Sequence, residues 1–269
     1  MITSTSNGKI KKIIKYAKSA KERRKADVFL VEGIRMFLEI PVERMLETYV
    51  TKDFYEKNSN LLEQIDYELV ADHVMDAITD TKSPQGVVSV VRRLHYRPEE
   101  VCGLEKDQDG EQQEKPLIIV LENLQDPGNL GTIIRTAEGA GVTGVLMSRD
   151  TVDIYNPKVI RSTMGSVFRV PFCYVENLVE WMNKLNALGF ATYGAHLQGT
   201  SFYDQNYKKA TVFAIGNEGN GLTIELLKAA NQKIWIPMRG KVESLNAATA
   251  STVLMYEAMR QRYTTPRQN

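Results

Sequence analysis

Three stretches in the second half of the chain combine amide, hydroxyl, carboxylate and guanidinium groups with glycines. The first is ENLQDPGNLG over residues 122–131, followed by TIIRTA over 132–137. On a helix beginning near Leu130, one face is apolar, and Arg135 points nearly opposite to it, where a large partner can reach the guanidinium. The same stretch also fits a plainer reading, with Asn129 as a helix N-cap and Arg135 as a solvated side chain.

The second stretch is GNEGNGL over residues 216–222, after an apolar strand-like run. Its glycines let backbone N–H groups approach a ligand closely, as a phosphate loop would. A phosphate loop has a lysine after its glycines, however, and the carboxylate of Glu218 would repel phosphate. A dinucleotide fingerprint follows the first strand of its domain, whereas this stretch follows the fifth. Glu218 is better suited to accept hydrogen bonds from a hydroxyl-bearing or cationic ligand.

The third stretch joins IWIPM over residues 234–238 to SLN over 244–246, and a helix opens directly afterwards. Ser244 fits a plain N-cap, but alanine stands at position 247, where a capping box has glutamate. The small residues that open the helix allow close packing against another element. None of the three stretches contains a histidine, so a Ser-His-Asp triad is not supported.

The elements that must position these stretches alternate regularly. Strands are predicted at 117–122, 144–148, 170–175, 190–194, 211–216 and 233–237, and helices at 130–140, 156–166, 177–188, 222–230 and 245–262. This alternation predicts an α/β fold with a parallel sheet covered on both faces. Ligands of such sheets bind at the carboxyl ends of the strands, and the three stretches lie at such ends.

Three segments divide the chain. Residues 1–98 are predicted to form a smaller α/β domain, residues 99–115 an acidic linker, and residues 116–269 the domain that carries the three stretches. The linker prediction rests on a composition rich in Glu, Gln, Asp and Gly, which cannot bury enough apolar surface to order itself.

Charge is distributed unevenly along the chain, although the net charge is only +1. Residues 1–25 hold nine lysines and arginines against one acid, and this excess predicts a polyanionic partner. A solvated helix face is the alternative.

Composition excludes several classes of protein. Hydrophobic residues at 43% and charged residues at 25% are ordinary globular values, which exclude collagen-like, disordered and coiled-coil chains. No apolar run approaches the roughly 18 residues of a membrane helix, and the N-terminus lacks a secretory signal. Two cysteines suit a reducing cytoplasm, and three widely separated histidines lack ligand spacing. We therefore expect a cytoplasmic protein with neither membrane nor metal as a partner.

Together the three stretches resemble the three motifs of the SpoU branch of the SPOUT RNA methyltransferases, in order, spacing and strand-to-loop context. The matching residues are NLQDPGNLG at 123–131 with RTA at 135–137, GNEG at 216–219 with GL at 221–222, and IPM at 236–238 with SLN at 244–246. FLVEGIR at 29–35 and SPQGV at 83–87 are similar, more loosely, to the substrate-binding domain of the family. That domain resembles a ribosomal protein that binds kinked RNA.

The resemblance implies S-adenosylmethionine-dependent 2′-O-methylation of RNA ribose, a trefoil knot near the C-terminus and a homodimer. It implies catalytic or substrate-positioning roles for Asn129, Arg135, Glu218, Ser244 and Asn246. It implies cofactor contacts at Gly194, Gly216, Asn217, Ile236, Met238, Leu245 and Ala247. The candidate RNA contacts are Lys9, Lys11, Lys12, Arg23, Arg24 and Arg35.

The attacking ribose hydroxyl must lose its proton, and the family proposal assigns its activation to the arginine. Because an arginine stays protonated, we expect Arg135 to grip the adjacent phosphate while Asn129, Ser244 and Asn246 aim the hydroxyl. Large-subunit ribosomal RNA is the expected substrate, since two-domain relatives often act on it. A tRNA substrate and a catalytically silent RNA-binding or assembly protein remain as alternatives. The extra N-terminal domain weighs against the first, and the intact polar set weighs against the second.

Overall fold

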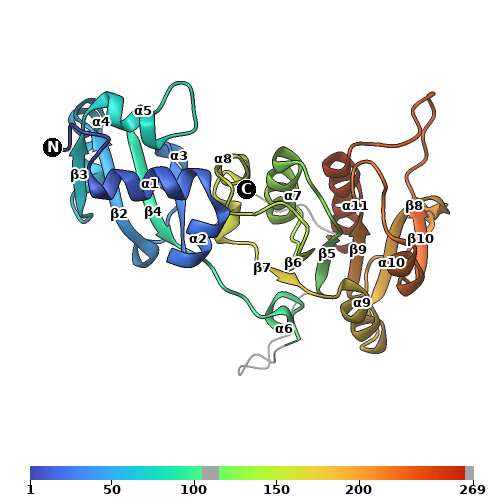
Figure 1. The fold of residues 1–269 in the computed structure, drawn as a ribbon. Helices are drawn as coiled ribbons and strands as arrows, with labels where there is room; N and C mark the ends of the chain where they lie inside the picture. The colour runs from blue at the N-terminus through green and yellow to red at the C-terminus, as the bar shows by residue number, and fades with distance from the viewer. Residues whose placement is uncertain (105–114, 264–269) are drawn as a thin grey trace. The chain divides into compact units, whose positions relative to one another are not determined.

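The computed structural model describes residues 1–104 and 115–263, and the chain divides into two compact units (Figure 1). Unit 1 comprises Met1–Leu94 and Asp153–Phe168, and unit 2 comprises His95–Val152 and the chain from Arg169 onward. Among the described residues, no helix is both long and apolar enough to cross a membrane.

Unit 1 is built on a four-stranded sheet of order β1-β4-β2-β3. Its strands are β1 (Val28–Glu32), β2 (Met45–Thr51), β3 (Tyr67–Val70) and β4 (Val87–Arg92), and only β2 and β3 pair in parallel. Its helices are α1 (Gly8–Lys18), α2 (Ala20–Ala26), α3 (Ile34–Phe37), α4 (Lys52–Asn58) and α5 (Asp72–Ile78), with the 3-10 turns η1 (Val42–Arg44) and η2 (Ser59–Leu62).

Helix α1 shows why this sequence folds as it does. Ile10 and Ile13 are fully buried against the sheet and α5, while the lysines between them face outward. The side chain of Asn7 caps the helix by accepting a hydrogen bond from the backbone N–H of Lys9 at 2.9 Å. The apolar stripe and its basic face are therefore as the sequence predicts.

Helix α8 (Pro157–Thr163) and the 3-10 turn η3 (Ser166–Phe168) pack on unit 1, whereas the sequence analysis assigned this helix to the second domain. Tyr155, just ahead of α8, lies 4.8 Å from Phe29 between ring centroids. Its hydroxyl exchanges two hydrogen bonds with the backbone of Leu94. The helix itself was predicted correctly, but periodicity identifies a helix and not the surface that it covers.

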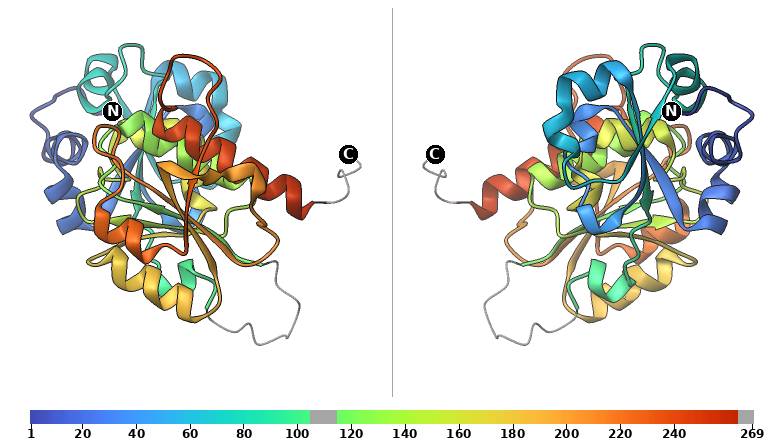
Figure 2. Two further views of the ribbon diagram at one scale, coloured as in Figure 1. Left: turned by 90° about the vertical axis from the view of Figure 1, so that its right-hand side faces the viewer. Right: turned by 90° about the vertical axis from the view of Figure 1, so that its left-hand side faces the viewer.

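Unit 2 is built on a six-stranded parallel sheet of order β10-β8-β9-β5-β6-β7. Its strands are β5 (Leu117–Leu121), β6 (Gly144–Ser148), β7 (Phe172–Val175), β8 (Ala191–Ser201), β9 (Thr211–Ile215) and β10 (Gln232–Trp235). Its helices are α6 (Pro98–Val101), α7 (Pro127–Gly139), α9 (Leu178–Ala187), α10 (Ile224–Ala229) and α11 (Ala247–Arg262), with the 3-10 turn η4 (Phe202–Asp204). Helices α7 and α11 cover one face of the sheet, and α6, α9 and α10 cover the other (Figure 2). The predicted α/β fold with a covered parallel sheet is confirmed.

Strand β8 is longer than the predicted strand at 190–194. Its first residues pair with β9, and its last residues pair with the edge strand β10 after a register shift. Gly199 lies so close to β10 that an added Cβ would be 2.6 Å from the backbone nitrogen of Ile234. The extension lacks an apolar alternation, so its sequence gives no strand signal.

The predicted linker begins later than position 99. Residues 98–101 form α6, and Val101 and Cys102 are fully buried in the core of unit 2. These two buried side chains and the ion pair of Glu99 with Lys184 at 2.8 Å hold this turn on unit 2, despite its acidic composition. Residues 105–114, the centre of the predicted linker, lie outside the described residues.

Candidate active site

The first stretch forms the start of α7, and Asp126 rather than Asn129 is its N-cap. The Oδ1 of Asp126 accepts a hydrogen bond of 2.7 Å from the backbone N–H of Asn129. Pro127 at the first helical position explains this early start, since proline is favoured there. The Asp-Pro pair was the sequence signal for this cap, and the N-cap reading of Asn129 is wrong. The Asn129 side chain is thereby left to make other contacts.

Hydrogen bonds join one side chain from each of the three stretches. The Nδ2 of Asn246 donates to the Oδ1 of Asn129 at 3.0 Å, and the Nδ2 of Asn129 donates to the Oε1 of Glu218 at 2.9 Å. These contacts join residues 89 and 117 positions apart in the sequence. The structure thus brings three of the predicted catalytic residues into one polar chain.

Glu218 is held as a carboxylate by its surroundings. Its two oxygens also accept hydrogen bonds from the backbone N–H groups of Gln125 and Asp126, each at 3.3 Å. Burial raises the pKa of Glu218, but the hydrogen bonds from Asn129 and the backbone outweigh burial, so the net effect is a lowered pKa. Glu218 therefore acts as a fixed negative acceptor, and its lowered pKa does not suit a proton donor.

The glycine-rich loop that carries Glu218 is a tight, preformed turn. Asn217 and Gly221 exchange two backbone hydrogen bonds, and Gly221 has a φ of +69°. An added Cβ at Gly216 would overlap the backbone of Gly221, so no other residue fits there without a shift. The Asn217 side chain accepts from the N–H of Gly219 at 2.8 Å and donates to the carbonyl of Asn123 at 2.8 Å. These bonds tie the loop to the first stretch.

The N-cap of α11 is Asn246 and not Ser244. The Oδ1 of Asn246 accepts from the backbone N–H of Ala248 at 2.9 Å, which leaves its Nδ2 for Asn129. Ser244 is exposed in the loop before the helix, and within the described part of the chain it makes no hydrogen bond. The N-cap reading of Ser244 is therefore wrong, and the structure does not bring its hydroxyl to the Asn129 chain.

Two of the predicted cofactor positions, Gly216 and Ile236, directly follow the carboxyl ends of parallel strands, whereas Gly194 lies within β8. Gly194 pairs with Ala214 in β9, Gly216 directly follows β9, and Ile236 directly follows β10. Residues 236–245 make no backbone hydrogen bond to other described residues, although Ile236, Pro237, Met238 and Leu245 are half-buried. Half-buried residues whose backbone groups have no partner in the described chain fit a ligand held through the backbone.

Two further cofactor predictions fall on packed positions. An added Cβ at Gly194 would be 3.0 Å from the side chain of Leu227, so this glycine faces α10, and Ala247 is buried at the start of α11. Among the described residues, no group of His, Cys, Asp or Glu is arranged to hold a metal ion.

Arg135 lies apart from the polar chain. It is six positions after Asn129 on α7, and it is exposed, with no hydrogen bond or ion pair to any described residue. Its neighbours on α7 face α11: the hydroxyls of Thr136 and Thr252 are 3.5 Å apart, and an added Cβ at Gly139 would be 3.2 Å from the Tyr256 hydroxyl. Within the described part of one chain, the guanidinium makes no hydrogen bond to Asn129, so its predicted catalytic role stays a prediction.

Known proteins match both parts of the chain. Residues 116–256 match the model of the SpoU rRNA Methylase family. The chain belongs to the SpoU rRNA methylase family. Residues 7–89 match the model of the MRM3-like substrate binding domain. The resemblance drawn from the three stretches is thereby confirmed.

Two curated relatives span nearly the whole chain. The 23S rRNA (guanosine(2553)-2′-O)-methyltransferase RlmP of Bacillus subtilis is 32% identical over 257 residues, covering 95% of this chain and 97% of the relative. The 23S rRNA (uridine(2479)-2′-O)-methyltransferase of Streptomyces viridochromogenes is 31% identical, covering 90% of this chain and 85% of the relative.

Solved structures of SpoU proteins share the fold. The SpoU methyltransferase AviRb of Streptomyces viridochromogenes, in complex with AdoMet, has a TM-score of 0.83 at 25% identity and covers 97% of this chain and 100% of its own. The AdoMet-bound rRNA methyltransferase of Sinorhizobium meliloti has a TM-score of 0.81 at 30% identity and covers 98% of both chains.

One predicted RNA contact of this SpoU protein is wrong. Arg23 is only 3% exposed, and its guanidinium pairs with Asp153 at 2.6 Å and donates to the carbonyl of Tyr16 at 2.7 Å. A run of charged residues in the sequence does not reveal which of their side chains is buried. Of the others, Lys9 pairs with Glu68 but stays exposed. The remaining candidates, Lys11, Lys12, Arg24 and Arg35, are all exposed.

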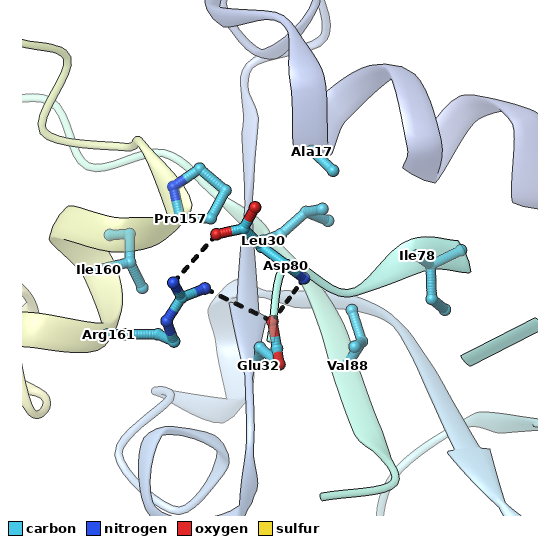
Figure 3. Close-up of a pocket in the computed structure, with 9 residues that line it drawn as sticks. All are labelled: Ala17, Leu30, Glu32, Ile78, Asp80, Val88, Pro157, Ile160 and Arg161. Atoms are coloured by element: carbon cyan, nitrogen blue, oxygen red, sulfur yellow. Dashed lines mark hydrogen bonds and ion pairs between the residues drawn. The ribbon is translucent and has the colours of Figure 1, made fainter. Parts of the chain in front are cut away.

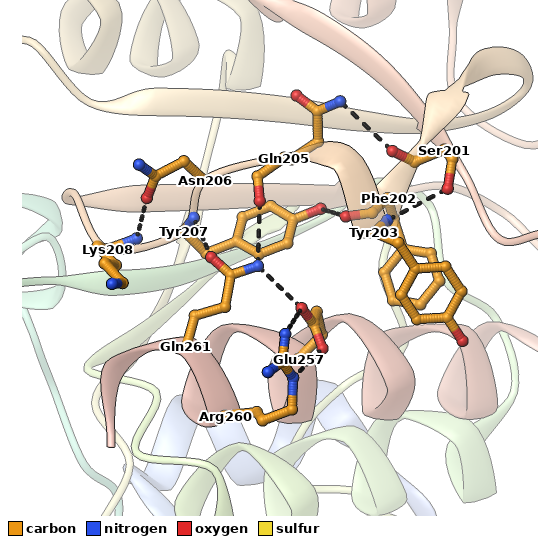
Figure 4. Close-up of polar contacts among 10 residues, drawn as sticks. All are labelled: Ser201, Phe202, Tyr203, Gln205, Asn206, Tyr207, Lys208, Glu257, Arg260 and Gln261. Atoms are coloured by element: carbon orange, nitrogen blue, oxygen red, sulfur yellow. Dashed lines mark hydrogen bonds and ion pairs between the residues drawn. The ribbon is translucent and has the colours of Figure 1, made fainter. Parts of the chain in front are cut away.

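The far end of α11 is tied to the segment that follows β8 (Figure 4). The Gln261 side chain accepts from the N–H of Tyr207 at 2.9 Å and donates to the carbonyl of Gln205 at 3.0 Å. Glu257 accepts from Gln261 at 2.8 Å and from two nitrogens of Arg260 at 2.8 Å. Because Asn246 is the N-cap of α11, this network also holds the helix that positions a site residue.

Replacing Glu257 with glutamine should lower the free energy of unfolding at neutral pH by about 1–3 kcal/mol, because charge-assisted hydrogen bonds are lost. The hydrogen bonds from Arg260 lower the folded-state pKa of Glu257. A lowered carboxyl pKa stabilises the fold above the unfolded-state pKa of about 4.3 and ceases to do so as pH falls through the folded value. The difference in the free energy of unfolding between the wild-type protein and Glu257→Gln should therefore be smaller below pH 4 than at pH 7. Urea unfolding at the two pH values measures this difference.

The matched control is Glu225→Gln, on an exposed carboxylate of α10 that has no partner among the described residues. A difference for Glu257→Gln that stays constant with pH, or one that equals the control, would contradict the role of the carboxylate.

Proposed function

We propose that this SpoU protein transfers the methyl group of S-adenosylmethionine to a ribose 2′-hydroxyl of large-subunit ribosomal RNA. The observation that carries the proposal is the hydrogen-bonded chain of Asn246, Asn129 and Glu218 at the strand ends. It is supported by the two relatives named as 23S rRNA 2′-O-methyltransferases and by the AdoMet-bound SpoU structures.

The polar chain fixes which groups of Asn129 are available to a substrate. Glu218 is an acceptor, so the amide nitrogen of Asn129 must face it, and the amide oxygen then faces Asn246. One N–H and one lone pair of the Asn129 amide remain for a ribose hydroxyl. Asn129 is thus held in a single orientation in which it can aim the attacking oxygen.

The cofactor would be held by the backbone at Gly216, at residues 236–238 and at Leu245. These residues are half-buried, and residues 236–238 and Leu245 make no backbone hydrogen bond to other described residues. When bound, S-adenosylmethionine supplies a methyl group on a sulfonium, ready for attack by an oxygen.

We further propose that the protein acts as a homodimer in which the partner subunit's Arg135 serves each pocket. This proposal is supported by the exposed guanidinium of Arg135 beside the α7–α11 surface, where Tyr256 is 43% exposed. There the guanidinium would grip the phosphate next to the target ribose. The trefoil knot is also part of the proposal, because α11 leaves the edge strand β10 and packs on α7, across the sheet from it.

The test is methyl transfer from tritiated S-adenosylmethionine to 23S ribosomal RNA and to bulk tRNA, both prepared from cells that lack the gene. We expect label in 23S RNA, at one ribose that mapping of 2′-O-methyl groups identifies. Label found only in tRNA would show that the substrate is tRNA and not ribosomal RNA. RNA that binds without acquiring label would indicate an assembly protein.

A further inference from the structure

A cleft with both polar and apolar side chains in its lining opens on unit 1. Its volume is about 280 Å³. Arg35 and Met36 of α3 line one side, Ser83 and Gln85 come from the loop before β4, and Met164 comes from the end of α8. This size is at the low end of small-molecule pockets, which are about 300–1,000 Å³. It suits a single nucleotide and is too small for a duplex.

Glu32 and Arg161 line this cleft and also line a second, smaller pocket drawn in Figure 3, where they form a charge-balanced network with Asp80. Arg161 of α8 pairs with Asp80 at 3.0 Å and lies 3.7 Å from Glu32 at the end of β1. Glu32 also accepts hydrogen bonds from the backbone N–H of Asp80 at 3.1 Å and from the Thr81 hydroxyl. The two carboxylates balance the charge of Arg161, so this network does not attract an anion strongly.

The backbone beside the cleft is held in shape at Gly33, which lines the cleft, and at Gly86, which follows Gln85. The Oε1 of Gln85 accepts from the backbone N–H of Ile34 at 3.0 Å, and an added Cβ at Gly33 would be 2.7 Å from that oxygen. Gly33 and Gly86 have φ values of +88° and +77°, which favour glycine. The amide nitrogen of Gln85 and the hydroxyl of Ser83 have no partner within the described chain, so both can bond a ligand.

The remaining lining supplies one positive charge and two apolar surfaces. Arg35 is exposed and makes no hydrogen bond or ion pair to described residues. Met36 is buried, and Met164 is held in the left-handed region at φ +51°, which is costly for a side chain with a Cβ. Methionine sulfur packs well against aromatic rings. A nucleotide matches these groups, because it has an anionic phosphate, a flat base and hydrogen-bonding groups at the edges of that base.

We propose that this cleft binds one unstacked nucleotide of the RNA substrate, with Arg35 on its phosphate and Met36 and Met164 against its base. Single-stranded RNA is commonly read through bases that leave the stack and make edge contacts. The inference rests on the proposed function, since it names how the RNA is held. It assigns to α8, which lies inside the matched methylase region, a part in substrate binding.

The first test reads the cleft directly, in the full-length protein labelled at methionine methyl groups. Titration with the four ribonucleoside 5′-monophosphates should shift the NMR signals of Met36 and Met164, and Arg35→Gln should weaken that binding about tenfold. The matched control is Arg92→Gln, an exposed arginine at the opposite end of β4. Unshifted methyl signals, or equal shifts with inorganic phosphate alone, would overturn the nucleotide site.

The second test uses 23S ribosomal RNA in a filter-binding assay across a range of salt. Arg35→Gln should weaken binding and reduce the salt slope by about one, whereas Arg92→Gln should change neither. If Arg35→Gln weakens monophosphate binding but leaves RNA binding intact, the cleft serves a free nucleotide and the proposal fails. Neither test measures methyl transfer, so the proposed enzymatic activity can stand or fall separately.

Discussion

Replacing Asn129 with alanine is expected to lower kcat for methylation of ribosomal RNA by about 100-fold, because a misplaced nucleophile costs about that much. The variant removes the link between Asn246 and Glu218, and with it the groups that aim the ribose hydroxyl. Binding of S-adenosylmethionine should stay nearly unchanged, since its predicted contacts are backbone groups elsewhere. Steady-state methyl transfer and calorimetric titration of the cofactor measure the two quantities.

Asn220→Ala is the matched control, since this amide lies in the same glycine-rich loop and its side chain has no partner among the described residues. It should retain most of the wild-type kcat. Full activity of Asn129→Ala would show that the hydroxyl is positioned without this side chain, and a comparable loss in the control would point to damage of the loop.

Arg135→Ala is expected to reduce kcat/KM by about 1,000-fold, near the upper range for removing one charged hydrogen-bond donor from a transition state. Arg135→Lys should recover part of the loss, since lysine keeps the charge but cannot grip a phosphate in the bidentate way. The measurement is a pH profile of methyl transfer together with RNA affinity. If lysine restored nearly full turnover at high pH with unchanged RNA binding, the residue would be a general base instead.

Mixed dimers test which subunit supplies Arg135. Co-expression of Arg135→Ala and Asn129→Ala chains should give about a quarter of the wild-type activity. Random pairing makes half of the dimers mixed, and each mixed dimer has one intact pocket if the arginine acts across the interface. Failure of the mixture to exceed the separate variants would indicate that Arg135 serves the pocket of its own chain.

Sequence periodicity was sufficient for the architecture of unit 2. Buried parallel strands are almost continuously apolar, as Leu117–Leu121 and Thr211–Ile215 are, so their positions and alternation with helices could be predicted. The extension of β8 beyond Gly194 could not, because its edge pairing requires no apolar pattern.

The residues of the polar site could be predicted from the sequence, but the hydrogen bonds between them could not. The motifs identify Asn129, Glu218 and Asn246, yet their hydrogen bonds depend on two helix caps that the sequence analysis assigned elsewhere. The Asp126-Pro127 pair carried enough information for the first cap. The burial of Arg23 was beyond prediction, because its partner Asp153 is 130 positions away.

The placement of α8 has a consequence for how this protein can be cut or recombined. Residues 153–168 are encoded between β6 and β7 of unit 2, yet they cover β1 of unit 1. A fragment that ends before the predicted acidic linker would lack Tyr155, whose ring packs on Phe29, and Asp153, whose carboxylate pairs with Arg23. Neither unit is therefore encoded by one contiguous piece of the gene. A single crossover within the predicted acidic linker cannot replace one whole unit with that of a distant homologue.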